Sequence, residues 1–303
     1  MSAARILETI GGLSRPLTER DLRGLSGLRQ IDRRDFLELW TTLTPERRTS
    51  LAREMVELSE ESVELDLSEL WTWLLDDTDA TVRASAVEGL WENTAPRTMR
   101  RMLVMMRNDT SEEVRAAAAV GLSRFGYMAS LGELDDGAEL LERDLALIEL
   151  DERQPQEVRR RALESAGYFA ENEAVQHQIE RDFASDEQLL QESALVAMGR
   201  AMLPRWLPQI GEALRSESPA LRYEAARAAG ELADGARGLL PRLARLMTSR
   251  DTEIALAAIW SMGQIGGDVA EDALQQVKRS EDEARSQAAT EALEELKMGK
   301  SLL

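Results

Sequence analysis

Residues 111–122 read SEEVRAAAAVGL, and this short pattern decides the fold. An apolar residue, Val114, directly precedes Arg115, and Ala118 and Leu122 follow the valine by four and eight residues. Spacings of four and eight keep side chains on one face of a helix. The serine before the run is a residue type that caps a helix start by accepting from its free N–H groups. The stretch therefore predicts a helix that buries one face of small side chains.

The same pattern recurs seven times along the chain. Its apolar first residue, which we call the anchor, is Val82, Val114, Val158, Leu190, Leu221, Ile254 and Ala284. Each anchor follows a polar turn, and upstream of the turn lies a second apolar-periodic segment, such as 204–214 or 241–247. Each repeat therefore predicts two antiparallel helices, A and then B. A repeat of about thirty residues at a nearly fixed period is typical of a solenoid.

The pattern of an acidic turn, Val-Arg and a following alanine, on paired helices, resembles HEAT repeats in the short variety also found in bilin lyases. The resemblance covers about residues 70–297. It implies an all-α fold, an α-solenoid superhelix of about seven to eight helix pairs with B helices lining the concave side. We expect one solenoid domain over 1–303: a degenerate cap and repeat over 1–70, repeats over 71–297, and an insertion near 127–138. The insertion accounts for the one spacing of 44 residues, and its role is left open.

Composition restricts the chemistry of this chain. Its 303 residues include 56 acidic and 37 basic side chains, no cysteine and a single histidine, for a net charge of −19. So acidic a surface disfavours nucleic acid and anionic membranes as partners. No apolar run approaches the length of a membrane helix, and no secretory segment is evident, so we expect a cytoplasmic protein. We expect no metal, because His177, between Glu173 and Glu180, is more typical of an exposed helical histidine than of a metal ligand. With one histidine and no cysteine, we also expect no cofactor and no catalysis.

Helix geometry predicts where a partner binds. With the anchor as position zero and 100° per residue, positions 2, 3, 6 and 10 of each B helix lie opposite the core. In the later repeats this stripe combines aromatic and arginine side chains, the types enriched in binding hot spots. The alternative is that Trp260 or Tyr223 packs sideways against the neighbouring repeat. The candidate partner-binding residues are Arg161, Glu164, Tyr168, Arg200, Tyr223, Arg227, Glu231, Trp260 and Gln264.

Two charge patterns have alternative interpretations. Arginines that follow anchors, such as Arg83 and Arg222, either bond the acidic turn of a neighbouring repeat as a structural ladder, which we favour, or form an anion-binding row. Residues 54–82 contain ten acidic and no basic side chains. This acidic stretch either attracts a basic partner or is a solvated face that aids solubility, and we favour solubility.

The sequence therefore favours a non-catalytic scaffold or adaptor that binds a protein or peptide, possibly a basic one, along its B-helix face. The first alternative is a chromophore chaperone or enzyme of the bilin-lyase kind, which is suggested by the repeat resemblance alone. A second alternative, a HEAT-like DNA-repair glycosylase, needs a basic groove and is opposed by the net charge of −19. The identity of the partner, the pathway and the oligomeric state stay open.

Overall fold

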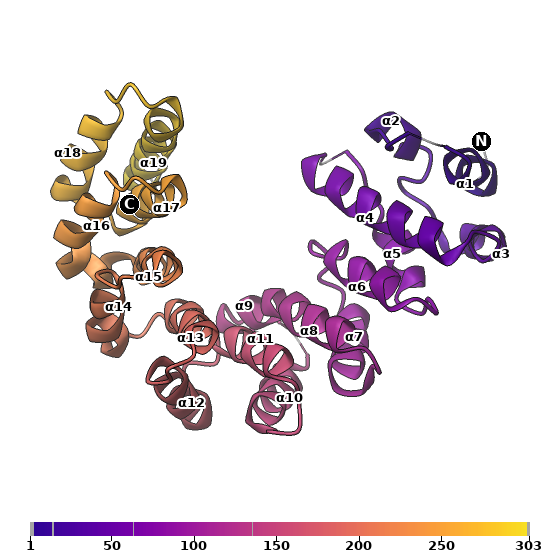
Figure 1. Ribbon diagram of the computed structural model, residues 1–303, viewed down its shortest axis with the longest axis horizontal. Helices are drawn as coiled ribbons and strands as arrows, with labels where there is room; N and C mark the ends of the chain where they lie inside the picture. Colours follow the sequence, from indigo (N-terminus) through magenta and orange to yellow (C-terminus); the bar gives the residue numbers. More distant parts are fainter. Residues whose placement is uncertain (1–2, 14, 63, 135, 302–303) are drawn as a thin grey trace. The chain divides into compact units, whose positions relative to one another are not determined.

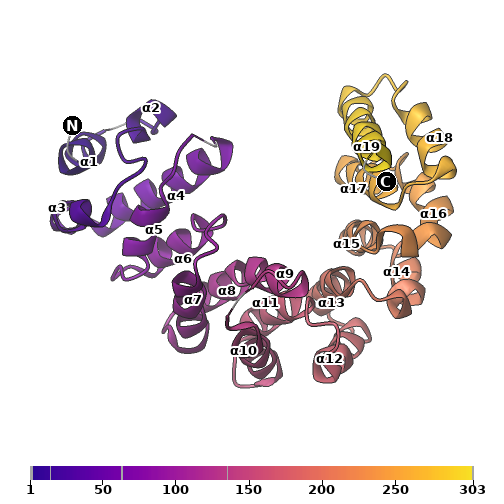
Figure 2. The ribbon, with the colours of Figure 1, turned by 180° about the vertical axis from the view of Figure 1, so that it is seen from behind.

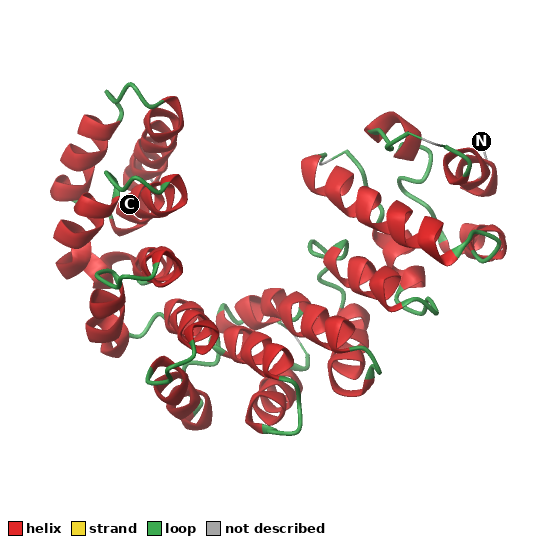
Figure 3. Ribbon diagram, in the orientation of Figure 1, coloured by secondary structure: helices red, strands yellow, loops and turns green. Residues whose placement is uncertain are grey.

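The computed structural model describes residues 3–13, 15–62, 64–134 and 136–301, and over these residues it is helical, with no strand (Figure 3). The all-α fold predicted from the sequence is therefore confirmed. Contacts between residues divide the chain into two compact units, Met1–Ala162 and Leu163–Leu303. The prediction of a single domain over 1–303 stays a prediction.

The first unit consists of short helices at its start and paired helices after them (Figure 1). The B helices α4, α6 and α8 pack on one another in order, and α7 packs on both α8 and α10. The elements are α1 (Ala3–Gly11), α2 (Glu19–Leu22), the 3-10 helix η1 (Gln30–Asp32), α3 (Arg33–Trp40), α4 (Pro45–Glu61), α5 (Ser68–Leu74), α6 (Ala80–Glu88), α7 (Pro96–Asn108), α8 (Glu112–Gly121), α9 (Ser123–Ser130), α10 (Ala138–Leu150) and α11 (Gln156–Ala166), whose last residues belong to the second unit.

The second unit is a two-layer stack. The B helices α13, α15, α17 and α19 pack side by side in one layer, and α12, α14, α16 and α18 form the other (Figures 1 and 2). Its elements are α12 (Glu173–Phe183), α13 (Gln188–Ala201), η2 (Pro204–Trp206), α14 (Leu207–Ala213), α15 (Pro219–Glu231), η3 (Ala233–Leu239), α16 (Leu240–Leu246), α17 (Thr252–Ile265), α18 (Asp268–Val277) and α19 (Glu283–Ser301).

The polar turns cap the B helices, as their sequences predict. The side chain of Asp79 accepts from the backbone N–H groups of Thr81 and Val82, and Asp251 caps α17 in the same way. Ser111 and Ser218 each accept from the N–H of the anchor three residues later. These bonds satisfy donors that a helix start leaves free, so each repeat begins its B helix at a fixed residue.

Alanine four residues after the anchor is the most uniform core position. The six side chains at this position in the first six copies are fully buried: Ala86, Ala118, Ala162, Ala194, Ala225 and Ala258. The seventh copy departs from the predicted register, because Ala284 is exposed and Ala288 only half-buried. Ala289 and Leu293 are buried instead, so the register of α19 is shifted by one residue. The prediction of Ala284 as an anchor is therefore wrong, because α19 places Arg285 at that position.

Glycines nine residues after the anchor bring neighbouring B helices into backbone contact. A Cβ on Gly167 would lie 2.8 Å from the Cα and the carbonyl oxygen of Ala197, and one on Gly199 would lie 3.0 Å from the Cα of Ala228. Gly263 approaches Ala292 in the same way. In each pair the glycine of one repeat meets a small residue about seven positions after the next anchor. We call this series of contacts the small-residue seam.

Arginines after the anchors bond the polar turns, and at Arg83 one of them reaches the turn of the next repeat, as the ladder that the sequence favours requires. Arg83 donates to both carboxylate oxygens of Asp109 in the next repeat, at 2.7 and 2.9 Å, and to the carbonyl of Asp77. Arg115 and Arg222 likewise donate to the carbonyl six residues earlier, each at 2.7 Å. The Arg83 guanidinium lowers the pKa of Asp109 although burial of that carboxyl opposes the effect. These bonds hold each polar turn against its own B helix and, at Arg83, against the neighbouring repeat.

The degenerate N-terminal repeat has a buried core and an arginine bond like those of the other repeats. Trp40, Leu51 and Met55 are buried, as predicted, and Arg48 donates to Asp77 at 2.7 Å like an arginine of the ladder. Within the predicted insertion, the start belongs to α9, which ends at Ser130, and the end belongs to α10, which begins at Ala138. Asp135 lies outside the described residues.

Replacing Gly167 with alanine should destabilise the second unit by about 1–3 kcal/mol, because the new methyl group meets backbone atoms of Ala197 that have no side-chain freedom to yield. Thermal unfolding followed by circular dichroism measures the change. Gly235→Ala is the matched control, since a Cβ there meets open space and should change stability by less than about 0.5 kcal/mol. Equal effects of both substitutions would contradict the seam.

Candidate partner-binding site

The predicted stripe lies on the B helices α13, α15 and α17 of the second unit and just after α11. Tyr168, Tyr223 and Trp260 are each half-buried, as are Arg200 and Arg227. Glu231 and Gln264 are exposed. Gln264 also donates to Glu295 of α19 at 2.8 Å. Eight of the nine candidate residues belong to the second unit.

Arg161 is the one candidate residue that belongs to the first unit. Its guanidinium is half-buried and donates to Glu157 one turn earlier, at 2.9 Å. Within the first unit it therefore acts as a helix-surface ion pair.

Glu164 is buried, which corrects its predicted exposure. Its side chain is 6% exposed and accepts from the hydroxyl of Ser193 at 2.6 Å, a bond between α11 and α13. The reason is the small-residue seam: neighbouring B helices come so close that the flanks of the predicted stripe face the next helix rather than solvent. Ser193 and Ala257, at the third position after their anchors, are buried for the same reason. The accessible stripe is therefore narrower than the sequence predicts.

Arginine and aromatic side chains of adjacent B helices stack in pairs. Arg227 of α15 lies over the ring of Trp260 of α17, at 3.7 Å from its centroid, and Arg200 of α13 lies 5.4 Å from the ring centroid of Tyr168. Trp260 also covers Gly230 of α15, whose missing Cβ leaves space for the ring. Such cation–π pairs contribute about 0.5–2 kcal/mol each. Trp260 is therefore partly a packing residue, which is the alternative that the sequence leaves open.

Glu224 is the most perturbed carboxyl of this face. Its pKa is raised to about 7, mainly by burial and also by the nearby carboxylates Glu164 and Glu192, while Arg227 and Arg200 act in the opposite direction. Beside it, a pocket of about 290 Å³ opens between the first turns of α15 and α17. It is lined by Pro219, Ala220, Tyr223, Glu224, Asp251, Glu253 and Ile254. Sequence analysis placed Tyr223 on the face but missed the pocket, because α17 supplies half of its wall.

Two strongly exposed aromatic residues lie outside the predicted stripe. Trp91 and Tyr127 are 48% and 49% exposed, and both lie in the first unit. Trp91 follows the end of α6. Tyr127 lies on α9, which begins directly after the end of α8. The signal that would have found Trp91 is its position directly after Leu90, the last core residue of its B helix, whereas Tyr127 lies at the start of the predicted insertion.

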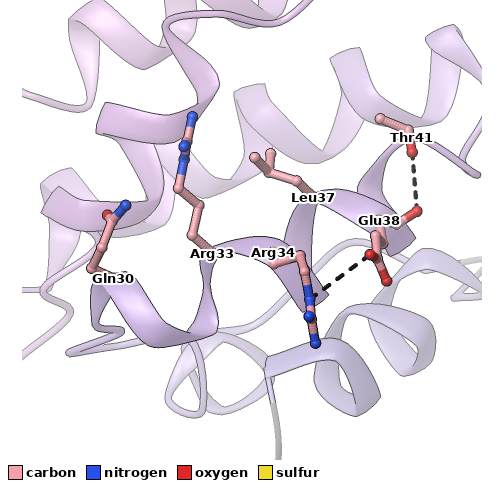
Figure 4. A pocket seen from close by; sticks show the side chains of 6 residues that line it. All are labelled: Gln30, Arg33, Arg34, Leu37, Glu38 and Thr41. Atoms are coloured by element: carbon pink, nitrogen blue, oxygen red, sulfur yellow. Dashed lines mark hydrogen bonds and ion pairs between the residues drawn. The ribbon is translucent and has the colours of Figure 1, made fainter.

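Several acidic side chains of the first unit form ion pairs. Within the acidic stretch, Asp76, Asp77 and Glu69 pair with arginines of the same unit. A separate pocket of about 520 Å³ lies along α3, where Arg34 is 3.9 Å from Glu38 (Figure 4). Its lining, which is Gln30, Arg33, Arg34, Leu37, Glu38 and Thr41, combines charges of both signs on an open surface.

Among the described residues, no three side chains of the metal-binding types gather in one place. His177 is exposed and lies 3.5 Å from Glu180, which also pairs with Arg205. Over the same part of the chain, no helix combines the length and the apolar character that crossing a membrane requires.

A protein-family model of HEAT repeats matches residues 67–143 and 207–294, which is more than half of the sequence. The chain belongs to the HEAT-repeat family. The resemblance predicted from the Val-Arg pattern is thus confirmed. None of the curated proteins matches the sequence.

Solved HEAT-like solenoids show the same fold. The complex of CpcE and CpcF of phycocyanin lyase from Nostoc sp. PCC7120 matches with a TM-score of 0.51 and 16% identity, over 76% of this chain and 94% of that one. A Kap95:Nup1 complex matches with a TM-score of 0.51 and 15% identity, over 97% of this chain and 46% of that one. At such low identity these likenesses concern the fold alone.

Replacing Glu224 with glutamine should stabilise this HEAT-repeat chain at pH 8 by about 1–2 kcal/mol, after allowance for solvent screening. Folded Glu224 holds its proton more tightly than the unfolded chain, so the free energy of unfolding falls as pH rises from 4.5 to about 7. Below that window the carboxyl is neutral in both states, and the variant should gain little. Urea unfolding at pH 4.5 and pH 8 tests this, with the exposed Glu212→Gln as control. A stability gain that does not depend on pH would contradict the interpretation.

Proposed function

We propose that this chain is a non-catalytic protein-binding scaffold, and that a segment of its partner lies across the B helices α13, α15 and α17. The observation that carries the proposal is the row of half-buried aromatic and arginine side chains on adjacent helices: Tyr168 with Arg200, Tyr223, and Trp260 with Arg227. Aromatic and arginine residues provide most hot spots of protein interfaces, because they offer large contact areas and fixed polar groups.

The support is geometric. The row spans four consecutive repeats, from Tyr168 just after α11 to Trp260 on α17, so an extended segment could contact several of its side chains at once. The side chains are held in place by cation–π stacking and by the seam, which reduces the cost of ordering them on binding. Nothing in this row depends on a cofactor, and its groups are suited to contact rather than to proton or group transfer. The cytoplasm stays the expected location.

Charge favours a partner with basic character. The chain carries −19, and Glu224, Glu231 and Glu192 lie among the arginines of the face. Acidic surfaces attract basic segments and accelerate their encounter. Membranes and nucleic acids fit this charge poorly, as the composition indicates. For the bilin-lyase-like alternative, the shared fold is the supporting observation.

Tyr223→Ala and Tyr168→Ala should each weaken partner binding by about 10-fold or more, because loss of a hot-spot aromatic costs about 2 kcal/mol. Trp260→Ala should also lower the melting temperature, since truncation of a packed tryptophan costs about 3 kcal/mol or more of stability. The partner is first captured from native cells, and its affinity for each purified variant is then measured beside a thermal melt.

Tyr127→Ala is the matched control, since this tyrosine is exposed in the other unit. Its removal should leave the affinity for the partner unchanged. If the affinity falls for Tyr127→Ala and not for Tyr168→Ala or Tyr223→Ala, the B-helix face of the second unit is not the binding site, and the proposal is wrong.

A further inference from the structure

The pocket between the first turns of α15 and α17 combines an aromatic wall with three carboxyl groups. Tyr223 and Glu224 come from the second turn of α15, and Asp251 and Glu253 come from the start of α17. Pro219 adds exposed apolar surface, and the buried Ile254 lies beneath the pocket. At about 290 Å³ the pocket is at the small end of ligand sites, so it fits one long side chain better than a cofactor.

The carboxyl groups of this pocket differ in their hydrogen bonding. One oxygen of Asp251 accepts from the N–H groups of Glu253 and Ile254, at 3.0 and 3.3 Å, so this carboxylate is fixed in place. Glu224 is half-buried, and within the described chain no hydrogen bond or ion pair is found for it. A desolvated carboxylate without a partner is unfavourable, and a cation placed beside it would remove that cost.

No basic side chain lines the pocket, and the arginines of α15 are bound elsewhere. Arg222 donates to the carbonyls of Ser216 and Glu217, at 2.7 and 2.9 Å. Arg227 stacks on Trp260 and lies 3.8 Å from Glu231. The N-termini of two helices contribute about half a positive charge each, which three carboxylates exceed. The pocket is therefore complementary to a cation from outside the chain.

We propose that this pocket binds a single basic side chain, an arginine or a lysine, of the partner protein. The aliphatic stem would lie against Tyr223 and Pro219, and the charged end would meet Glu224, Asp251 and Glu253. Aromatic faces and carboxylates together are the groups that hold guanidinium and ammonium ions most strongly. This proposal rests on the proposed function and specifies which residue type of the partner anchors it.

Binding in this pocket should depend on pH. The charged groups around Glu224 are Glu164 near the end of α11, Glu192 and Arg200 on α13, and Arg227 on α15, with Asp251 and Glu253 at the start of α17. Burial and the carboxylates keep Glu224 partly protonated near neutral pH. A bound cation favours the ionised form, so affinity should rise as pH increases through about 7.

The test uses the full chain and a blocked peptide, acetyl-Gly-Arg-Gly-amide, titrated by NMR. At pH 8 we expect saturable shifts of the Tyr223 and Glu253 amides with a Kd on the order of 1 mM, and affinity about 5-fold or more weaker at pH 5.5. Acetyl-Gly-Gln-Gly-amide should not bind. Glu224→Gln should weaken binding at pH 8 about 5-fold and abolish its pH dependence, and Glu253→Gln should weaken it without affecting folding.

Glu212→Gln, which removes an exposed carboxylate of α14 outside the pocket, should leave the affinity for the peptide unchanged. The proposal is overturned if neither peptide shifts these amides, if both bind equally, or if Glu224→Gln binds as the parent does. The peptide experiment does not involve the partner, so its failure would overturn only the pocket proposal. The scaffold proposal is tested separately, by the effect of Tyr168→Ala on partner binding. Conversely, a peptide that binds while Tyr168→Ala and Tyr223→Ala leave partner binding intact would overturn the scaffold proposal.

Discussion

The contact between glycine and a small residue of the next B helix is the constraint on which the rest of the second unit depends. At Gly167 and Gly199 there is no space for a methyl group, because backbone atoms of Ala197 and Ala228 occupy it. This close approach buries Glu164 and Ser193 and allows Trp260 to cover Gly230. It also places the first turn of α17 beside that of α15, where their side chains form a pocket. Packing of the smallest side chains thus determines which larger ones remain accessible.

Much of the fold follows from sequence periodicity alone. The alanine at the fourth position, the capping residues and the arginine ladder are each signalled by residues of one repeat or two adjacent ones. The predicted register of the last copy is off by one residue because the Ala-rich α19 offers several nearly equivalent registers. The contact with Gly263 and the bond from the Arg285 N–H to Asp282 fix the observed one.

The candidate site was less predictable than the fold. A helical wheel orders side chains around one axis and carries no information on the distance to the next helix. It therefore placed Tyr223 and Arg227 on the correct face but assigned Glu164 to solvent. The pocket is formed by residues of two helices, and the raised pKa of Glu224 depends on groups of three, so no single stretch of sequence indicates them. Trp91 and Tyr127 were missed because they lie beyond the repeated pattern.

The bond from the Ser261 hydroxyl to the carbonyl of Ala226, at 2.6 Å, has a mechanical consequence. It joins α17 to α15 at a point where alanine and glycine provide almost no rotamers, so the two helices cannot slide past one another by exchanging side-chain conformations. Any relative movement has to break this bond or bend backbone. The two helices therefore behave as a stiff pair. A partner that binds across them meets a surface that is already ordered, so binding loses little further conformational entropy.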